Sequence, residues 1–217
     1  MVRVLALLFA GAALVSAADY RADFAPERKN LGTVGSNPYF ILTPGYKLHY
    51  ADGATHSTVT VLAEIVIIDG VQCRVVVDRE EKDGNPVEIT RDYYAIDQST
   101  GDVYYFGEDV DVYKDGKVAS HEGSWRSGVD GAQFGLMMPG KLVKGDRFAQ
   151  ERAPRQKAMD RSEVIALSEK IATPAGEFDC VHFKDSSAIE NAVDHKWYAA
   201  GVGLVKDGKA VLVKVER

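Results

Sequence analysis

The sequence predicts an all-β chain with little helix, built as a large curved antiparallel sheet or half-barrel meander with an apolar glycine-rich loop. The dipeptide Asp-Gly occurs six times, and it is a preferred hairpin turn because both of its residues tolerate positive φ. Segments rich in Val, Ile, Thr and Tyr lie between these turns, and such residues favour strands. Long helical periodicity is nearly absent, so an antiparallel meander is the simplest arrangement.

Five segments have the composition of strands. In chain order they are STVTVLAEIVI (57–67), QCRVVVDRE (72–80), PVEITRDYYAID (86–97), DVYYFGEDVDVY (102–113) and KAVLVKVE (209–216). The segment 151–163 predicts at most a short helical turn at 156–160, because Pro154 limits where a helix can start.

The N-terminus has the pattern of a secretory signal peptide. Residues 1–3 give a positive start, VLALLFAGAALV is an apolar run, and the small residues 16–18 precede the charged segment DYRADF. This pattern predicts cleavage after Ala17 or Ala18. The apolar run is shorter than the ~20 residues that a membrane-spanning helix needs.

We therefore expect a signal peptide at 1–17, a flexible N-terminal segment at 18–36 and a single β-rich domain at 37–217. About 200 residues are enough for one domain with a sizeable core. The mature chain would be exported to the periplasm or the extracellular space, with no transmembrane segment. The formal net charge of −6 argues against nucleic acid as a partner, because nucleic-acid binding needs clustered Lys and Arg.

The acidic, tyrosine-rich stretch 97–116 raises the question of a calcium loop. In an EF-hand alignment, Asp97, Ser99 and Glu108 fall at positions one, three and twelve. Gly101 then occupies a ligand position, and position six, which requires glycine, holds an aspartate. A hairpin with QSTG as its turn is therefore the favoured interpretation.

Strict alternation along 102–113 places Tyr105, Asp109 and Asp111 on one face and Glu108 on the other. Asp109 and Asp111 are thus the candidate metal ligands, and a surface module that binds calcium weakly stays an alternative.

The stretch GSWRSGVDGAQFGLMMPG (123–140) carries large apolar residues among five glycines. It lacks the Gly-Lys-Ser/Thr of a phosphate-binding loop. It could form a lid over a hydrophobic pocket, where pliable Met suits varied ligands, or a connector that plugs the open end of the sheet. The candidate ligand-binding residues are Trp125, Phe134, Met137, Met138 and, from a later strand, Trp197.

The chain has two cysteines, Cys73 and Cys180, each in an apparent strand. In an oxidising compartment they are candidates for a disulfide, which would be worth about 4–5 kcal/mol in the chain-entropy model. The bridge requires Cα atoms within ~7 Å, and the alternative is two separate buried thiols.

No catalytic residue and no cofactor is predicted. The five histidines include no zinc-binding spacing, and no serine lies in a GxSxG elbow. Cys180 and His182 lie two residues apart on one strand, which invites a Cys–His nucleophile only if Cys180 is free.

Four stretches carry a resemblance to known proteins: NPYFILTPGYKLHY (37–50), DYYAIDQSTGDVYYFGEDV (92–110), IATPAGEFDCVHFKDSS (171–187) and WYAAGVGLVK (197–206). Together they resemble a family of exported bacterial β-rich proteins of unknown function. That family is more distantly similar to the half-barrel lipoprotein carriers, in which a curved antiparallel sheet holds acyl chains. The resemblance implies a fold and a compartment, favours binding over catalysis, and supplies no catalytic residues.

Two functions follow as hypotheses. The first is an exported soluble binding or interaction module of the cell envelope, whose partner is an apolar small molecule or lipid in the concave face of the sheet, or another envelope protein. The second is a secreted hydrolase with a carboxylate or His site assembled in space. A carrier should have an open apolar cavity, and a hydrolase should have a buried carboxylate or His with a strongly perturbed pKa in that cavity.

Overall fold

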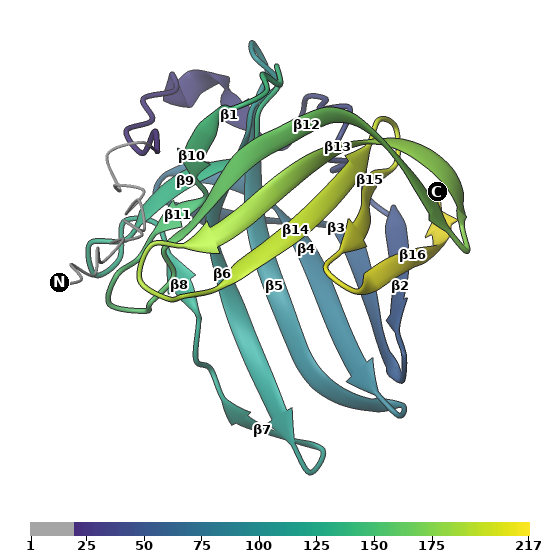
Figure 1. The fold of residues 1–217 in the computed structure, drawn as a ribbon. Helices are drawn as coiled ribbons and strands as arrows, with labels where there is room; N and C mark the ends of the chain where they lie inside the picture. The colour runs from purple at the N-terminus through teal and green to yellow at the C-terminus, as the bar shows by residue number, and fades with distance from the viewer. Residues whose placement is uncertain (1–19) are drawn as a thin grey trace, which may run out of the picture.

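The computed structural model describes residues 20–217, so the predicted signal peptide lies outside the described residues. The regular secondary structure of the described chain is almost entirely antiparallel strand, which confirms the predicted fold class (Figure 1). In chain order the elements are the 3-10 helix η2 (Arg28–Asn30) and the strands β1 (Leu31–Gly32), β2 (Lys47–Asp52), β3 (Thr55–Ile68), β4 (Val71–Lys82), β5 (Asn85–Asp97), β6 (Val103–Lys114), β7 (Lys117–Ser120), β8 (Trp125–Arg126), β9 (Gln133–Met138), β10 (Arg147–Ala149), β11 (Glu151–Arg152), β12 (Asp160–Thr173), β13 (Gly176–Ser187), β14 (Val193–Ala199), β15 (Gly203–Asp207) and β16 (Ala210–Glu216). No helix within residues 20–217 is long and apolar enough to cross a membrane.

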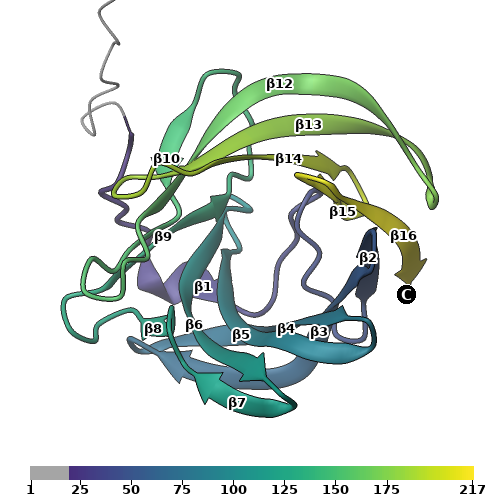
Figure 2. The same cartoon turned by 60° about the horizontal axis from the view of Figure 1, so that its bottom comes forward.

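The strands follow one another around a sheet that nearly closes into a barrel. Their order is β10-β12-β13-β14-β15-β16-β2-β3-β4-β5-β6-β9-β11, and β16 pairs with β2 to join the C-terminal and N-terminal halves. Figure 2 shows β12, β13 and β14 arching over one side, with β3 to β6 forming the opposite wall. One continuous cluster of buried side chains fills much of the space between the walls.

The two ends of this strand order meet at Gln150. This residue separates β10, which pairs with β12, from β11, which pairs with β9. The main chain of Gln150 lies directly over Gly135 of β9. A Cβ atom on Gly135 would come within 2.4 Å of the Gln150 carbonyl oxygen, so the closure requires a residue without a side chain at this position.

Three of the six Asp-Gly dipeptides form hairpin turns as the sequence predicts. Asp69, Asp83 and Asp115 have φ of 48°, 51° and 53°, and the glycine that follows each of them also has positive φ. These turns join β3 to β4, β4 to β5 and β6 to β7. Two successive positive φ values match the twist of the flanking strands, which explains why the long hairpins form here.

Strand β6 departs from strict alternation at Gly107. The register with β5 shifts by one residue between positions 105 and 107, and Gly107 has a φ of 139°. This bulge brings Tyr105 to the same inner face as Glu108. The prediction that Tyr105 shares a face with Asp109 and Asp111 is therefore wrong.

The segment predicted to be flexible, 18–36, lies against the barrel over its described part. The amide of Arg21 donates to the carbonyl of Arg147, and the amide of Ala149 donates to the carbonyl of Arg21. Strand β1 pairs with the end of β5. The segment is thus held at two points, and the domain boundary at residue 37 stays a prediction.

Part of the glycine-rich stretch 123–140 belongs to the sheet. Strand β8 pairs with β6, and β9 pairs with both β6 and β11. Residues 133–138 therefore form part of the barrel wall and are not a free lid.

We expect Gly135→Ala to lower the free energy of unfolding by about 1–3 kcal/mol or more, because the added methyl group meets rigid backbone at the closure. The matched control is Gly32→Ala in β1, where a Cβ would meet only the Gln98 amide at 3.8 Å. Urea unfolding of both variants measures the difference. Equal stability of the two variants would contradict this account of the closure.

Candidate functional site

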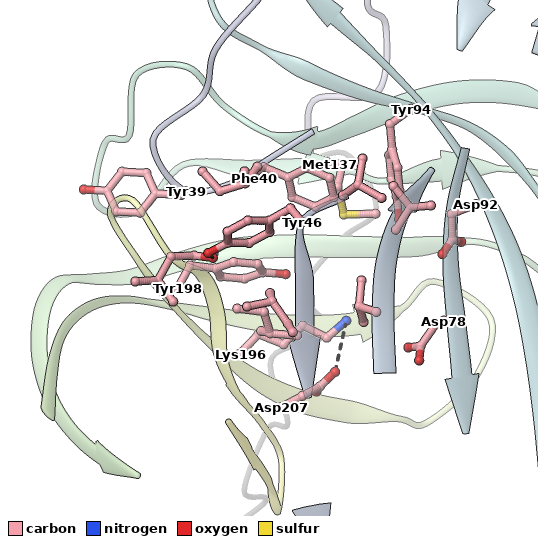
Figure 3. Close-up of a pocket in the computed structure, with 18 of the residues that line it drawn as sticks. Tyr39, Phe40, Tyr46, Asp78, Asp92, Tyr94, Met137, Lys196, Tyr198 and Asp207 are labelled. Carbon is pink, nitrogen blue, oxygen red and sulfur yellow. Dashed lines mark hydrogen bonds and ion pairs between the residues drawn. The ribbon is translucent and has the colours of Figure 1, made fainter. Parts of the chain in front are cut away.

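The barrel interior holds a cavity of about 180 Å³, and Figure 3 shows the side chains around it. Most of its wall is aromatic or aliphatic: Tyr39, Phe40, Ile41, Tyr46, Leu48, Tyr50, Val59, Val61, Val76, Tyr94, Met137, Tyr198, Val202, Gly203 and Leu204. Its polar side is formed by Asp78, Asp92, Lys196 and Asp207, from β4, β5, β14 and β15.

Three tyrosines of the wall are held by their hydroxyl groups or by a ring contact. Tyr46 donates to the carbonyl of Val202, and Tyr50 donates to the carbonyl of Leu204, both at 2.9 Å. The Tyr94 ring stacks on another tyrosine of the interior, with centroids 5.0 Å apart. The hydroxyl groups of Tyr46 and Tyr50 are therefore already hydrogen-bonded within the protein.

Lys196 is the only cationic residue of the described chain that lines the cavity. Its Nζ lies 3.1 Å from Asp185 Oδ2 and 3.9 Å from Asp207 Oδ2. Burial opposes the charge of Lys196, but Asp185 and Asp207 outweigh this effect and raise its pKa well above the usual range. The ammonium group of Lys196 therefore already forms ion pairs with two carboxylates of the protein.

The carboxyl groups of Asp78 and Asp92 are harder to ionise than ordinary aspartates. Burial raises the pKa of Asp78 to about 6, and repulsion from Glu80 and Glu88 adds to the rise. Burial also raises the pKa of Asp92 well above its usual range, with Glu108 as the next contribution.

These two carboxyl groups differ in their partners. Tyr105 donates a hydrogen bond of 2.7 Å to Asp92 Oδ1. Oδ1 of Asp78 and Oδ1 of Asp207 are buried and have no hydrogen-bond partner among residues 20–217. A buried carboxylate oxygen without a hydrogen-bond partner lowers the stability of the folded protein. A ligand that donates a hydrogen bond to either of these two atoms would remove this cost.

A second group of buried acids lies elsewhere in the interior. Burial raises the pKa of Glu151 to about 8, and the charge of Asp160 adds to this rise. Oε1 of Glu151 accepts a hydrogen bond from the Asp160 amide at 2.5 Å. Burial likewise raises the pKa of Glu108 to about 7. The interior therefore carries several carboxyl groups that titrate near neutral pH.

Of the five predicted ligand-binding residues, Met137 lines this cavity. Trp125 is buried against Tyr105 in an edge-to-face contact, with ring centroids 5.3 Å apart. Phe134 stacks on Phe106, with centroids 4.7 Å apart. Met138 is fully buried in the core.

Trp197 lies outside the cavity, on the face of β14 opposite to Lys196. Its Nε1 donates to Glu169 Oε2 at 2.8 Å, and its ring stacks on His182 with centroids 4.4 Å apart. His182 Nε2 in turn lies 2.7 Å from His195 Nδ1. The sequence analysis did not predict this outer cluster, although alternation places positions 195 and 197 together.

The predicted disulfide is absent, because Cys73 and Cys180 are both free and buried. They lie in β4 and β13, which do not pair. Burial raises the pKa of the Cys73 thiol to about 12 and that of Cys180 to about 11. The two thiols act as small core residues, which was the alternative considered for them.

The candidate metal ligands, Asp109 and Asp111, are each engaged by a neighbour. Asp109 forms an ion pair with Arg126 at 2.5 Å and accepts a hydrogen bond from Tyr93, and Asp111 lies 2.9 Å from His121 Nδ1. Within residues 20–217, no group of three or more His, Cys, Asp or Glu side chains could hold a metal ion.

The sequence analysis missed the four polar residues of the cavity. Asp78 continues the inward positions of Val76, and Lys196 shares its inward face with Tyr198. A charged residue at a position that alternation assigns to the core was the signal that could have identified them.

Comparison with known proteins gives limited matches. Residues 148–209, well under half of the chain, match the DUF3108-like family. A predicted exported protein of Bacteroides fragilis with a YmcC-like fold is 13% identical, with a TM-score of 0.45 over 84% of this chain and 100% of that one. A predicted lipoprotein of Parabacteroides distasonis is 14% identical, with a TM-score of 0.41 over 83% of this chain and 100% of that one. No curated protein matches the chain. None of these matches supplies an activity.

We expect Glu151→Gln to raise the free energy of unfolding at pH 9 by on the order of 3 kcal/mol, with little change at pH 5. The pKa of Glu151 is about 8 in the folded chain and 4.5 in its ordinary state, so folding penalises the charged form. The stability of the wild-type protein should therefore fall as pH rises between about 4.5 and about 8.

Urea unfolding across this pH range measures the effect. The control is Glu122→Gln, an exposed glutamate, which should leave the pH dependence unchanged. A Glu151→Gln variant with the same pH dependence as wild type would show that this side chain is not held in its neutral form.

Proposed function

We propose that this protein is an exported binding module of the cell envelope that holds an apolar ligand in the barrel cavity. The observation that carries this proposal is the cavity of about 180 Å³ with a largely aromatic and aliphatic wall. An apolar cavity of about 150 Å³ in a protein binds benzene. By that measure, this cavity has room for one aromatic ring or a short alkyl chain. A longer acyl chain would have to extend beyond it.

Two further features support the proposal. The signal peptide predicted from residues 1–17 favours a role outside the cytoplasm. The hydroxyl groups of Tyr46 and Tyr50 are already bonded to backbone carbonyls. A ligand in the cavity would therefore meet preformed ring surfaces, and preformed sites lose less conformational freedom on binding.

A hydrolase is the second candidate, and one observation favours it. The carboxyl groups of Asp78 and Asp92 face the same cavity, and burial raises the pKa of both. A carboxyl group with a pKa near 6 can act as a general acid or base at neutral pH. Assays with chromogenic esters and glycosides at pH 5–8 test this function: turnover that disappears in Asp78→Asn and in Asp92→Asn would favour it over binding.

Filling the cavity tests the binding function. We expect Val59→Phe to weaken binding of hexan-1-ol by at least about tenfold, because the added ring occupies the space that the ligand needs. The control is Val118→Phe, at an exposed position in β7. Calorimetric titration gives the Kd, and thermal unfolding shows whether each variant is folded. A folded Val59→Phe variant that binds as wild type would refute the cavity as the binding site.

The two neighbouring methionines should behave differently. Met137→Ala removes part of the cavity wall and is expected to weaken hexan-1-ol binding severalfold with a modest loss of stability. Met138 is 1% exposed, so Met138→Ala should cost about 2–5 kcal/mol of stability. Calorimetry and urea unfolding of both variants separate the two effects. Equal loss of binding in the two variants would contradict the placement of Met137 in the site.

A further inference from the structure

We propose that the natural ligand of this cavity is an organic cation, an ammonium ion that carries an apolar substituent. This inference rests on the proposed binding function and specifies the chemical class of the ligand. Three features carry it: an excess of carboxylates over cations, a wall of aromatic rings, and an acidic hollow that adjoins the cavity.

The charges that face the cavity are not balanced. Three carboxyl groups, Asp78, Asp92 and Asp207, face it together with one cation, Lys196. Burial raises the pKa of Asp92 well above its usual range, so Asp78 and Asp207 are the two carboxylates that face this one cation. Lys196 is shared between Asp207, which lines the cavity, and Asp185, which does not. Oδ1 of Asp78 has no hydrogen-bond partner in the described chain. A positive group on the ligand would supply both the missing charge and the missing hydrogen-bond donor.

The aromatic wall suits the same kind of ligand. Six of the residues that line the cavity have aromatic rings: Tyr39, Phe40, Tyr46, Tyr50, Tyr94 and Tyr198. Aromatic faces attract ammonium and alkylammonium groups through the ring quadrupole, and cages of such rings bind quaternary ammonium ions. An anionic ligand would gain nothing from these faces, and the carboxylates would repel it.

A second hollow, of about 520 Å³, adjoins the cavity at one end of the barrel. The two hollows share Tyr50 and Asp207 in their linings. Three further acids, Asp52, Glu80 and Asp194, line the outer hollow, together with the single cation Lys209. A cleft lined mainly by one sign of charge concentrates ligands of the opposite sign. The outer hollow and the cavity therefore favour the same charge.

A matched set of three ligands tests this inference on the full mature protein: hexylammonium, hexan-1-ol and hexanoate, titrated by calorimetry at pH 7.5. We expect hexylammonium to bind at least about tenfold more tightly than hexan-1-ol, and hexanoate to bind more weakly than either. Equal binding of the three would overturn the cation proposal and leave the binding function intact. Binding of none of them would refute the binding function itself.

Substitutions of single aspartates test which carboxyl group causes the preference for a cationic ligand. Asp78→Asn keeps the shape of the side chain and is expected to remove most of the preference for hexylammonium over hexan-1-ol. Asp207→Asn provides a second test, since Lys196 keeps its contact with Asp185. The control is Asp115→Asn in the turn between β6 and β7, where asparagine tolerates the φ of 53°. A full tenfold preference retained in both Asp78→Asn and Asp207→Asn would overturn the assignment to this site.

Discussion

The structure depends on the contact between the backbone of Gln150 and the bare Cα of Gly135. At this point the chain leaves one end of the strand order and joins the other. The amide of Gln150 donates to the carbonyl of Asp160. The residue between β10 and β11 is therefore also hydrogen-bonded to the first residue of β12. Without this close approach, the sheet would remain an open curved surface with its interior in water.

Closure explains the unusual electrostatics of the interior. The first cause of the raised pKa of Asp78, Asp92, Glu108 and Glu151 is in each case burial. Burial is a consequence of enclosing both walls around these side chains. The same enclosure holds Lys196 in its charged state, because the neighbouring carboxylates outweigh the desolvation of its ammonium group. Closure of the sheet therefore creates both the cavity and the raised pKa values of the carboxyl groups at its polar side.

Local features of the fold could be predicted from the sequence, and long-range features could not. The turns at Asp69, Asp83 and Asp115 form because two consecutive residues accept positive φ, which is a property of the dipeptide itself. The bulge at Gly107 escaped prediction because it depends on the approach of the Trp125 backbone, whose carbonyl oxygen would lie 2.3 Å from a Cβ there. Likewise, Cys73 and Cys180 are separated because their strands, β4 and β13, are not neighbours in the sheet. The order of strands in a sheet cannot be predicted from local sequence patterns. The cavity residues are of this second kind, since alternation groups Asp78 with Val76 on one face but does not show that this face encloses a cavity.

The pairing of β16 with β2 has a consequence for how the molecule assembles. Leu212 lies opposite Tyr50 in this pair, so two strands from distant parts of the chain must meet before the sheet is continuous. Pairing across so many residues carries a large loop-closure entropy, and folds dominated by such contacts form slowly. Without β16, β2 would pair only with β3 and would leave one open edge beside the cavity.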